Sequence, residues 1–112
     1  GVSSAASDVY KRQELLCSLD DVIREASRCL KSKGKMYMVH RPNRLVDIFD
    51  TMRKYHLEPK RMRLVYPYVN KAANMVLIEA VKGGNSQLIV EEPLIVYKTD
   101  GTYTDALLKM YE

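Results

Sequence analysis

The chain has 112 residues, enough for one small domain, and its 46% hydrophobic and 29% charged residues are typical of a folded protein rather than a disordered one. No apolar run approaches the roughly 20 residues of a membrane helix and no signal segment opens the chain, so we expect a cytoplasmic protein with no membrane partner. The formal charge of +4 is only a weak indication of a polyanionic partner. Two cysteines, Cys17 and Cys29, fit neither a disulfide framework nor a zinc pattern, so we expect reduced thiols and no metal.

The first residues have an unusual origin in this interpretation. Residues 3–13, SSAASDVYKRQ, are similar to the translation of a transposon adapter end used in sequencing libraries. Adapter scars are excluded from fold reasoning, so we expect residues 1–13 to be non-native and residues 14–112 to be the authentic sequence. The gene is then expected to have been cut near Glu14, with the rest of the parent upstream. The alternative is a natural polar arm.

The first authentic element is a predicted helix that begins at Ser18. Ser18 is a favourable N-cap residue, and Asp21 stands three positions later, close to a capping-box pattern. Gly34 is expected to end this unit in the left-handed conformation. Apolar residues recur at steps of three and four, which predicts one buried face made of Val22, Ile23, Ala26, Cys29 and Leu30.

A strand and a second helix are predicted next. The strand covers Lys35 to His40, and its continuous apolar run indicates a parallel strand covered on both faces. Pro42 suits the first turn of the helix, which is expected to end near His56, before Glu58-Pro59. The predicted buried face of this helix consists of Leu45, Val46, Ile48, Phe49 and Met52.

The remaining elements are short and mostly extended. Arg61–Tyr66 and Asn74–Val81 are predicted to pair as an antiparallel hairpin with a long loop. Two extended segments, Leu88–Val90 and Leu94–Tyr97, follow on either side of Pro93, and a short helix ends the chain. Helices alternating with strands predict an α/β layered fold whose sheet closes with the antiparallel pair.

The local sequences resemble the bacterial adenine-N6 methyltransferases that modify valine tRNA. The resemblance covers essentially all of residues 14–112, and its more specific parts are the His-Arg-Pro segment and the Pro-Leu-Ile-Val-Tyr tail. The matching segments are Leu16–Ile23, Gly34-Lys35, Val39–Leu45, Leu57–Arg61, Ala73–Ala80, Pro93–Tyr97 and Gly101–Thr104.

This resemblance implies the C-terminal half of a Rossmann-like class I methyltransferase sheet. Lys35–His40 would be the fifth strand, and Asn74–Val81 would be a seventh strand inserted antiparallel between the fifth and the sixth, Arg61–Tyr66. The family binds S-adenosyl-L-methionine through a glycine-rich turn and grips its target adenine with an Asn-Pro-Pro-Tyr motif. The chain contains neither motif. We therefore expect no catalytic or cofactor-binding residue in it, and we expect it to be inactive alone.

The candidate substrate residues are those expected at the carboxyl ends of strands, where α/β sheets bind their ligands. His40 and Arg41 end one strand, and Arg41 or Arg44 is a candidate phosphate contact; the alternative is that His40 caps the strand and Arg41 pairs with a carboxylate. In the loop 67–73, Tyr68 is a candidate to stack on a base and Lys71 to neutralise a phosphate. An ordinary hairpin loop is the preferred alternative there.

Five basic residues lie near the end of the second predicted helix and the start of the next strand. The cluster is a candidate RNA footprint, but a solvated helix end is the preferred interpretation: Arg53, Lys54, Lys60, Arg61 and Arg63. The leading hypothesis is a fragment of an S-adenosylmethionine-dependent methyltransferase acting on an adenine in the tRNA anticodon loop. Two alternatives stay open. One is a methyltransferase of ribosomal RNA or of protein glutamine, and the other is a non-catalytic RNA-binding or interaction module. We also expect marginal stability, because Lys35–His40 would be an exposed sheet edge.

Overall fold

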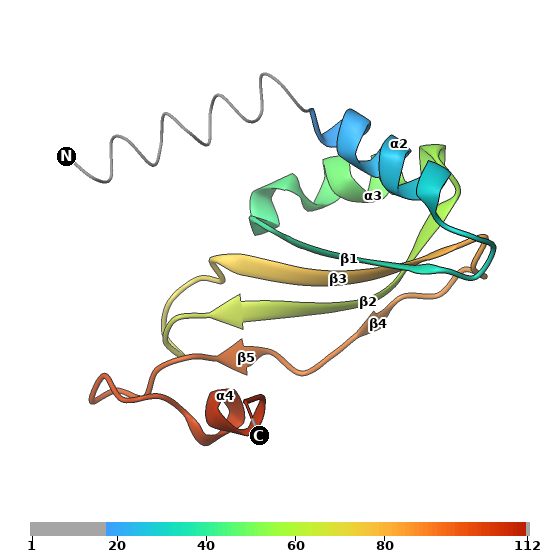
Figure 1. Cartoon of the computed structure of the whole chain (residues 1–112). Helices are drawn as coiled ribbons and strands as arrows, with labels where there is room; N and C mark the ends of the chain where they lie inside the picture. The colour runs from blue at the N-terminus through green and yellow to red at the C-terminus, as the bar shows by residue number, and fades with distance from the viewer. Residues whose placement is uncertain (1–17, 112) are drawn as a thin grey trace.

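The computed structural model describes residues 18–111 (Figure 1). The expected adapter-derived segment, residues 1–13, and Cys17 lie outside the described residues. The described elements are α2 (Leu19–Cys29), β1 (Lys35–His40), the 3-10 turn η1 (Pro42–Arg44), α3 (Leu45–Lys54), β2 (Leu57–Tyr66), β3 (Met75–Lys82), β4 (Ile89–Val90), β5 (Leu94–Ile95) and α4 (Asp105–Lys109).

The strands form one mixed sheet in the order β1-β3-β2-β4, with β5 also paired to β2. β3 runs antiparallel to both of its neighbours, so that Ile78 lies opposite Met38 on one side and Met62 on the other. β1 and β2 are therefore parallel to each other, and β4 and β5 run parallel to β2 on its outer side. This confirms the α/β fold class and the expected insertion of the late strand between the two earlier ones.

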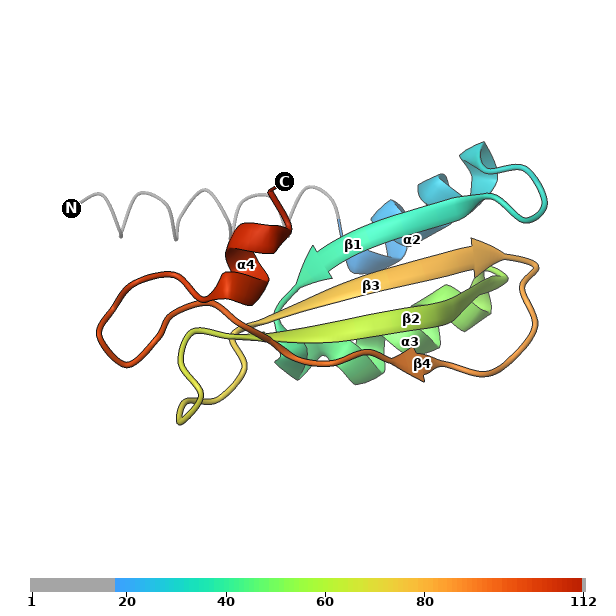
Figure 2. The same cartoon turned by 90° about the horizontal axis from the view of Figure 1, so that it is seen from below.

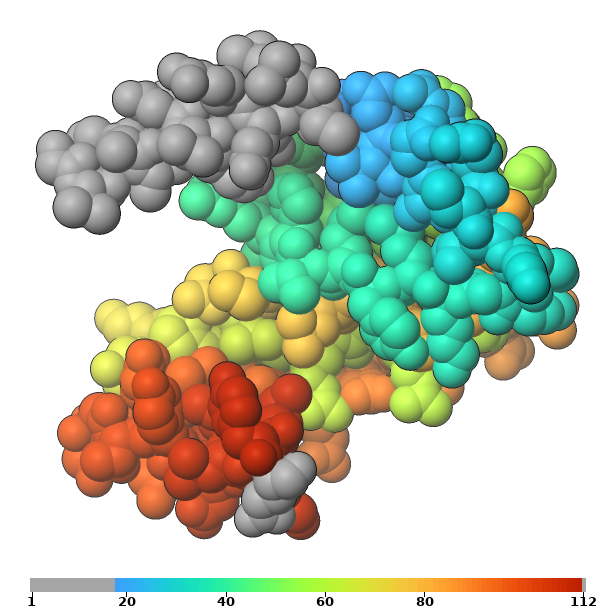
Figure 3. Space-filling view, in the orientation of Figure 1, coloured from blue at the N-terminus to red at the C-terminus, as the bar shows by residue number. Residues whose placement is uncertain are grey.

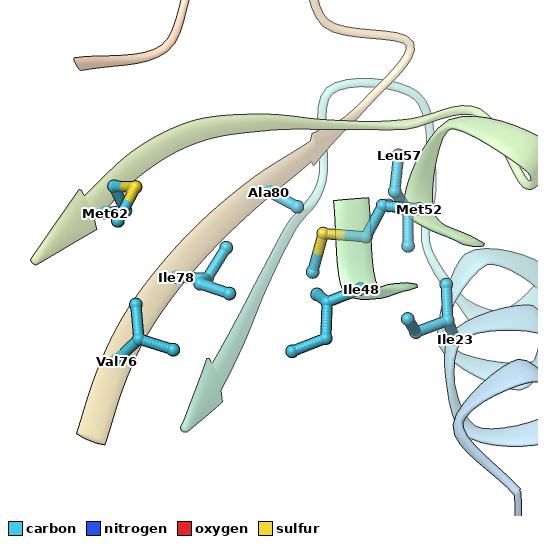
Figure 4. Close-up of a cluster of buried hydrophobic side chains, with 8 residues drawn as sticks. All are labelled: Ile23, Ile48, Met52, Leu57, Met62, Val76, Ile78 and Ala80. Carbon is cyan, nitrogen blue, oxygen red and sulfur yellow. The ribbon is translucent and has the colours of Figure 1, made fainter. Parts of the chain in front are cut away.

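One face of the sheet carries the hydrophobic core. α2 and α3 lie on this face (Figure 1), and the close-up in Figure 4 shows side chains from both helices and from β2 and β3 converging there. Because side chains alternate between the faces of a strand, every second residue of β3 enters this core. The core residues are Ile23, Ile48, Met52, Leu57, Met62, Val76, Ile78 and Ala80.

The other face of the sheet is open in the described part of the chain, which corrects the expectation for Lys35–His40. Alternate β1 residues are half-buried under the helices, but Tyr37 is 71% exposed and Val39 is 60% exposed. The continuous apolar run therefore does not mark a strand covered on both faces here. β1 also lies at the end of the strand order, as expected for an exposed edge.

The predicted start of α2 is confirmed, but the residue predicted to end this unit in the left-handed conformation is wrong. The backbone N–H of Asp21 donates to the Ser18 hydroxyl and the Asp21 carboxylate accepts from the Ser18 N–H, a complete capping box. The left-handed residue after the helix is Lys33, with φ of 69°, and not Gly34. Gly34 is required for another reason, since a Cβ there would lie 2.9 Å from the Lys31 carbonyl oxygen.

The predicted buried face of α2 was also partly wrong. Val22 and Cys29 are exposed, while Ser27 is 7% exposed. The Ser27 hydroxyl donates to the Tyr55 carbonyl oxygen at 2.6 Å, which satisfies that hydroxyl and joins α2 to the end of α3. A polar residue therefore occupies part of the helix–helix contact that the apolar pattern assigned to Cys29.

α3 and β2 differ from their predicted limits. α3 ends at Lys54, and His56 takes a left-handed conformation with φ of 64°, so the chain turns directly into β2 at Leu57. β2 thus begins before Arg61 and includes Pro59, next to a shift in the pairing with β3 between Pro59 and Arg61. Such irregular positions are where a strand accommodates proline. Val46, assigned to the buried face of the helix, is 81% exposed.

An acidic pH should weaken the contact between α2 and α3. The Asp20 carboxylate accepts from the Tyr55 hydroxyl at 2.6 Å and from Lys54 Nζ at 3.1 Å, and these bonds hold its pKa below the usual value. A lowered carboxyl pKa adds stability above the unfolded pKa of about 4, and this stability is lost as pH falls through the folded pKa. We expect Asp20→Asn to lower the melting temperature at pH 7 but progressively less below about pH 4.

Melting curves from neutral to acidic pH check this prediction. Tyr55→Phe is the matched variant, because it removes the bond that contributes most to the lowered pKa of Asp20. It should reproduce part of the same pH-dependent loss. A deficit in Asp20→Asn that stays constant across this pH range would contradict the prediction.

Candidate functional site

The candidate site lies at one end of the sheet, where β1 and β2 both finish. Because these strands are parallel, the connection from β1 through η1 and the loop 67–74 emerge at the same end (Figures 1 and 2). Ligands of open α/β sheets bind outside the carboxyl ends of strands. The sequence placed His40, Arg41, Tyr68 and Lys71 at this end, and the structure agrees with that placement.

A hollow of about 850 Å³ occupies this end between β1 and β3. Its lining joins two of the predicted residues, His40 and Arg41, to residues that begin β3 or precede it. The lining residues are Val39, His40, Arg41, Pro42, Asn43, Ala73, Asn74 and Met75. Asn43 and Asn74 add amide groups that the sequence analysis did not single out. Both lie beside predicted strand ends and inside segments that carry the resemblance, Val39–Leu45 and Ala73–Ala80.

His40 is oriented by its own neighbour. The half-buried imidazole accepts the backbone N–H of Arg41 at Nδ1, over 2.8 Å. A neutral imidazole that accepts at Nδ1 carries its hydrogen on Nε2, so Nε2 is a donor. Capping of the strand end, the structural alternative for His40, is therefore present, and it leaves Nε2 able to donate to a ligand.

Arg44 and Arg41 differ in their surroundings. Arg44 Nε lies 3.2 Å from the Asp47 carboxylate in the first turn of α3, and Arg44 is outside the lining of the hollow. Arg41 is exposed and lines the hollow. Of the two predicted phosphate contacts, Arg41 is thus the one that the fold places at the candidate site.

Tyr68 and Lys71 belong to the loop 67–74, which joins β2 to β3. The Tyr68 ring packs against Tyr97, which in turn stacks on Tyr103, with centroids 5.4 Å apart at each contact. Lys71 is exposed, and its backbone N–H bonds to the Tyr68 carbonyl oxygen at 3.1 Å. Neither residue lines the hollow beside His40. The sequence analysis missed Tyr97 and Tyr103, although both belong to segments quoted for the resemblance.

The predicted basic cluster is divided by ion pairs rather than gathered into one patch. Arg53 pairs with Glu58 at 2.8 Å, and Lys54 with Asp20 at 3.1 Å. Lys60 Nζ donates to the Asn85 carbonyl oxygen at 2.8 Å. These contacts satisfy the charges locally, so they favour the solvated helix end over an RNA footprint.

The remaining two members of the cluster, Arg61 and Arg63, face the open side of the sheet. Arg61 bonds Glu91 at 3.1 Å and Arg63 bonds it at 2.7 Å, and the hydrogen bond from Arg63 is the main cause of the lowered pKa of Glu91. Arg61 also lies 3.5 Å from Glu79, which pairs with Lys35 at 3.2 Å. A row of alternating charges therefore crosses the sheet from β1 to the segment after β4.

A second hollow, of about 570 Å³, lies on this open face of the sheet. Its lining includes Tyr37, Val39 and Leu77 from the sheet and Met110 from the end of α4. Figure 3 shows the C-terminal segment around α4 as a separate lobe on the side of the sheet away from α2 and α3. The face thus combines an ionic row with exposed apolar side chains. This combination could not be predicted from the sequence, because the charges meet only through strand pairing.

The residues of this chain do not fit an S-adenosylmethionine site. Such a site needs a glycine-rich turn between a strand and a helix, where backbone can approach the ligand. The chain has no Gly-x-Gly sequence. After β1 the backbone enters η1 through Arg41 and Pro42, without a glycine.

Residues 18–111 contain neither a metal-binding cluster nor a membrane-spanning helix. Among these residues no group of three or more His, Cys, Asp or Glu side chains is arranged to hold a metal ion. No helix in this part of the chain is long and apolar enough to cross a membrane.

Comparison with known proteins gives a match at the level of structure. No protein-family model matches the chain, and no curated protein matches it. The fold is similar to the crystal structure of a predicted O-methyltransferase, protein Atu636 from Agrobacterium tumefaciens, with a TM-score of 0.75 and 25% sequence identity. The match covers 82% of this chain and 44% of that protein, so the chain spans less than half of its length. The described residues therefore form a mixed α/β structure with a methyltransferase-like fold.

Proposed function

We propose that this chain is part of an S-adenosylmethionine-dependent methyltransferase that methylates N6 of an adenine in tRNA. The observation that carries the proposal is the order β1-β3-β2 with β3 antiparallel, in a fold that matches a methyltransferase. The choice of adenine and tRNA comes from the resemblance of segments such as Val39–Leu45 and Pro93–Tyr97. The methyltransferase fold alone does not select a substrate.

The cofactor site belongs, in this proposal, to a longer protein. Two features of the described residues support a further part of the protein packed beside this chain. β1 ends the sheet order, and its open face exposes Tyr37 and Val39. Apolar side chains on a sheet face are normally covered by another layer. The remaining part of the protein would cover this face and supply both the cofactor turn and the motif that grips the adenine.

The residues of this chain would then bind and orient the RNA. Methyl transfer to an exocyclic amine needs a base held away from its neighbours and aimed at the methyl donor. His40 and Arg41 lie where β1 ends, and both line the hollow at this end of the sheet. We assign Arg41 to a phosphate near the target nucleotide and His40 to hydrogen bonding within the same hollow.

Methyl transfer from radiolabelled S-adenosylmethionine tests the proposal. The chain would be extended upstream with the parent gene and incubated separately with unmodified tRNA, ribosomal RNA and protein substrates. Label in N6-methyladenine of tRNA, found by nucleoside analysis, is the expected result. Label only in ribosomal RNA or protein would keep the methyltransferase and replace its substrate. A lack of transfer to every acceptor by a protein that binds the cofactor would contradict the assignment, and RNA binding without cofactor binding would favour the non-catalytic module.

Arg41→Ala in the extended protein should weaken RNA binding through a lost phosphate contact. We expect a higher KM for tRNA, and a slope of log Kd against log salt concentration that is shallower by about 0.7–0.9. Lys31→Ala is the matched control, because Lys31 is an exposed cation at the opposite end of β1. Equal salt slopes for the wild type and the Arg41 variant would remove Arg41 from the RNA contact.

A further inference from the structure

Three tyrosine rings form a stack beside the loop that joins β2 to β3. The ring planes of Tyr68 and Tyr97 meet at 30°, and those of Tyr97 and Tyr103 at 20°, with 5.4 Å between centroids in both pairs. Tyr68 and Tyr97 are half-buried, whereas Tyr103, the last ring, is 51% exposed. Tyr97 stacks on the Tyr103 ring, so the exposed 51% of Tyr103 lies away from that contact.

Backbone hydrogen bonds fix the main chain that carries the Tyr97 and Tyr103 rings. Tyr97 and Tyr103 form an antiparallel bridge, and the turn between them is closed by the Lys98 N–H, which donates to the Thr102 carbonyl oxygen at 2.7 Å. The Tyr97 N–H donates to the Pro67 carbonyl oxygen at 2.9 Å, which fixes the stack to the end of β2. A ligand that stacks on Tyr103 would therefore lose little affinity to the ordering of its site.

The charges around the stack favour an anionic ligand that carries a flat ring. Lys98 is exposed in the turn that leads to Tyr103, and Lys71 is exposed in the loop that begins with Tyr68. Two carboxylates are near in sequence: the exposed Asp105 begins α4 two residues after Tyr103, and Asp100 lies in the same turn as Lys98. Asp100 is occupied by hydrogen bonds from the Thr102 hydroxyl and N–H, which together lower its pKa. Aromatic faces beside lysines are the usual surface for unpaired nucleotides.

We propose that the open face of Tyr103 is a stacking site for an unpaired nucleobase of RNA, with Lys98 and Lys71 contacting the adjoining phosphates. The inference rests on the proposed RNA substrate and deepens it. The loop 67–74 separates the stack from the hollow that holds His40 and Arg41, since its first residues pack on Tyr97 and its last residues line the hollow. The stacked base is therefore a nucleotide that flanks the target adenine.

Binding of short fluorescent oligonucleotides to the 112-residue chain tests the stacking site. The two probes are an oligouridine and an abasic oligomer of the same length, which keeps the phosphates and lacks the bases. Tyr103→Ala should raise the Kd for oligouridine by about 5- to 150-fold and leave the Kd for the abasic oligomer unchanged. Tyr103→Phe keeps the ring and should bind like the wild type. Tyr111→Ala, at an 85% exposed tyrosine beyond α4, should also bind like the wild type.

Equal oligouridine affinity for the wild type and Tyr103→Ala would overturn the stacking site. So would an equal loss of affinity for both probes, since the effect would then not depend on the bases. The proposed function fails separately. Methyl transfer to tRNA by an extended Tyr103→Ala protein with wild-type KM would refute the stacking site alone. Tyr103-dependent binding of oligouridine, combined with no methyl transfer to any RNA, would refute the enzymatic proposal alone.

Discussion

Ile48→Ala is expected to lower the free energy of unfolding by about 2–5 kcal/mol, the usual cost of cutting a fully buried side chain to alanine. Ile48 is 0% exposed and lies on α3, in the cluster that joins both helices to the sheet. Small domains have about 5–15 kcal/mol of stability in total, so this single truncation should remove a large share of it. Urea unfolding followed by circular dichroism measures the change.

Val46→Ala is the matched control for this prediction. Val46 lies on the same helix but is 81% exposed, so its truncation should change the free energy of unfolding by no more than about 0.5 kcal/mol. The sequence pattern placed both residues on the buried face. Similar losses in the two variants would contradict the packing of α3 described here.

Lys82→Met is expected to cost about 1.5–3 kcal/mol, a typical value for hydrogen bonds made by a charged group. Lys82 is half-buried at the end of β3, and its ammonium group donates to the carbonyl oxygens of Ser27 and Leu30, the latter at 2.8 Å. These carbonyls belong to the last turn of α2, where the helix leaves acceptors without partners and a cation is favourable. Methionine keeps the length of the side chain and removes the donors.

Lys33→Met separates this effect from the loss of a charge. Lys33 Nζ also donates to a backbone carbonyl oxygen, that of Gly83 at 2.8 Å, but the contact is exposed to solvent. Its loss should cost well under about 1 kcal/mol, because water replaces the bond. Thermal melts of both variants at the same pH make the comparison. Equal destabilisation would show that Lys82 contributes only through general electrostatics.

The local features of the fold could be predicted from the sequence. The capping box at Ser18 depends on residues three positions apart, and the strands and helices follow from apolar periodicity. The errors arose where contacts between segments distant in the sequence decide which side chains are buried. Val46 fits a helical period but is not covered by the sheet, and Ser27 is buried because Tyr55 offers it an acceptor. Which faces of β1 are covered depends on layers that its own sequence does not reveal.

The candidate site could also be predicted only where local sequence indicated it. His40 ends the predicted strand and Arg41 follows it, so the rule that ligands bind at strand ends pointed to both. Tyr103 lies six residues after its stacking partner Tyr97, across a turn, and no local pattern indicated that the rings would meet. The ionic row through Glu79 and Glu91 likewise needs the pairing of three strands.

We propose that the chain is part of a methyltransferase whose cofactor site lies elsewhere in a longer protein. Isothermal titration with S-adenosylmethionine tests it most directly, using the 112-residue chain and the same chain extended upstream with the parent gene. We expect binding by the extended protein and none by the 112-residue chain. Tight binding by the 112-residue chain itself would contradict that proposal, because it would require a cofactor site among residues that pack in the core or that we propose for RNA contact.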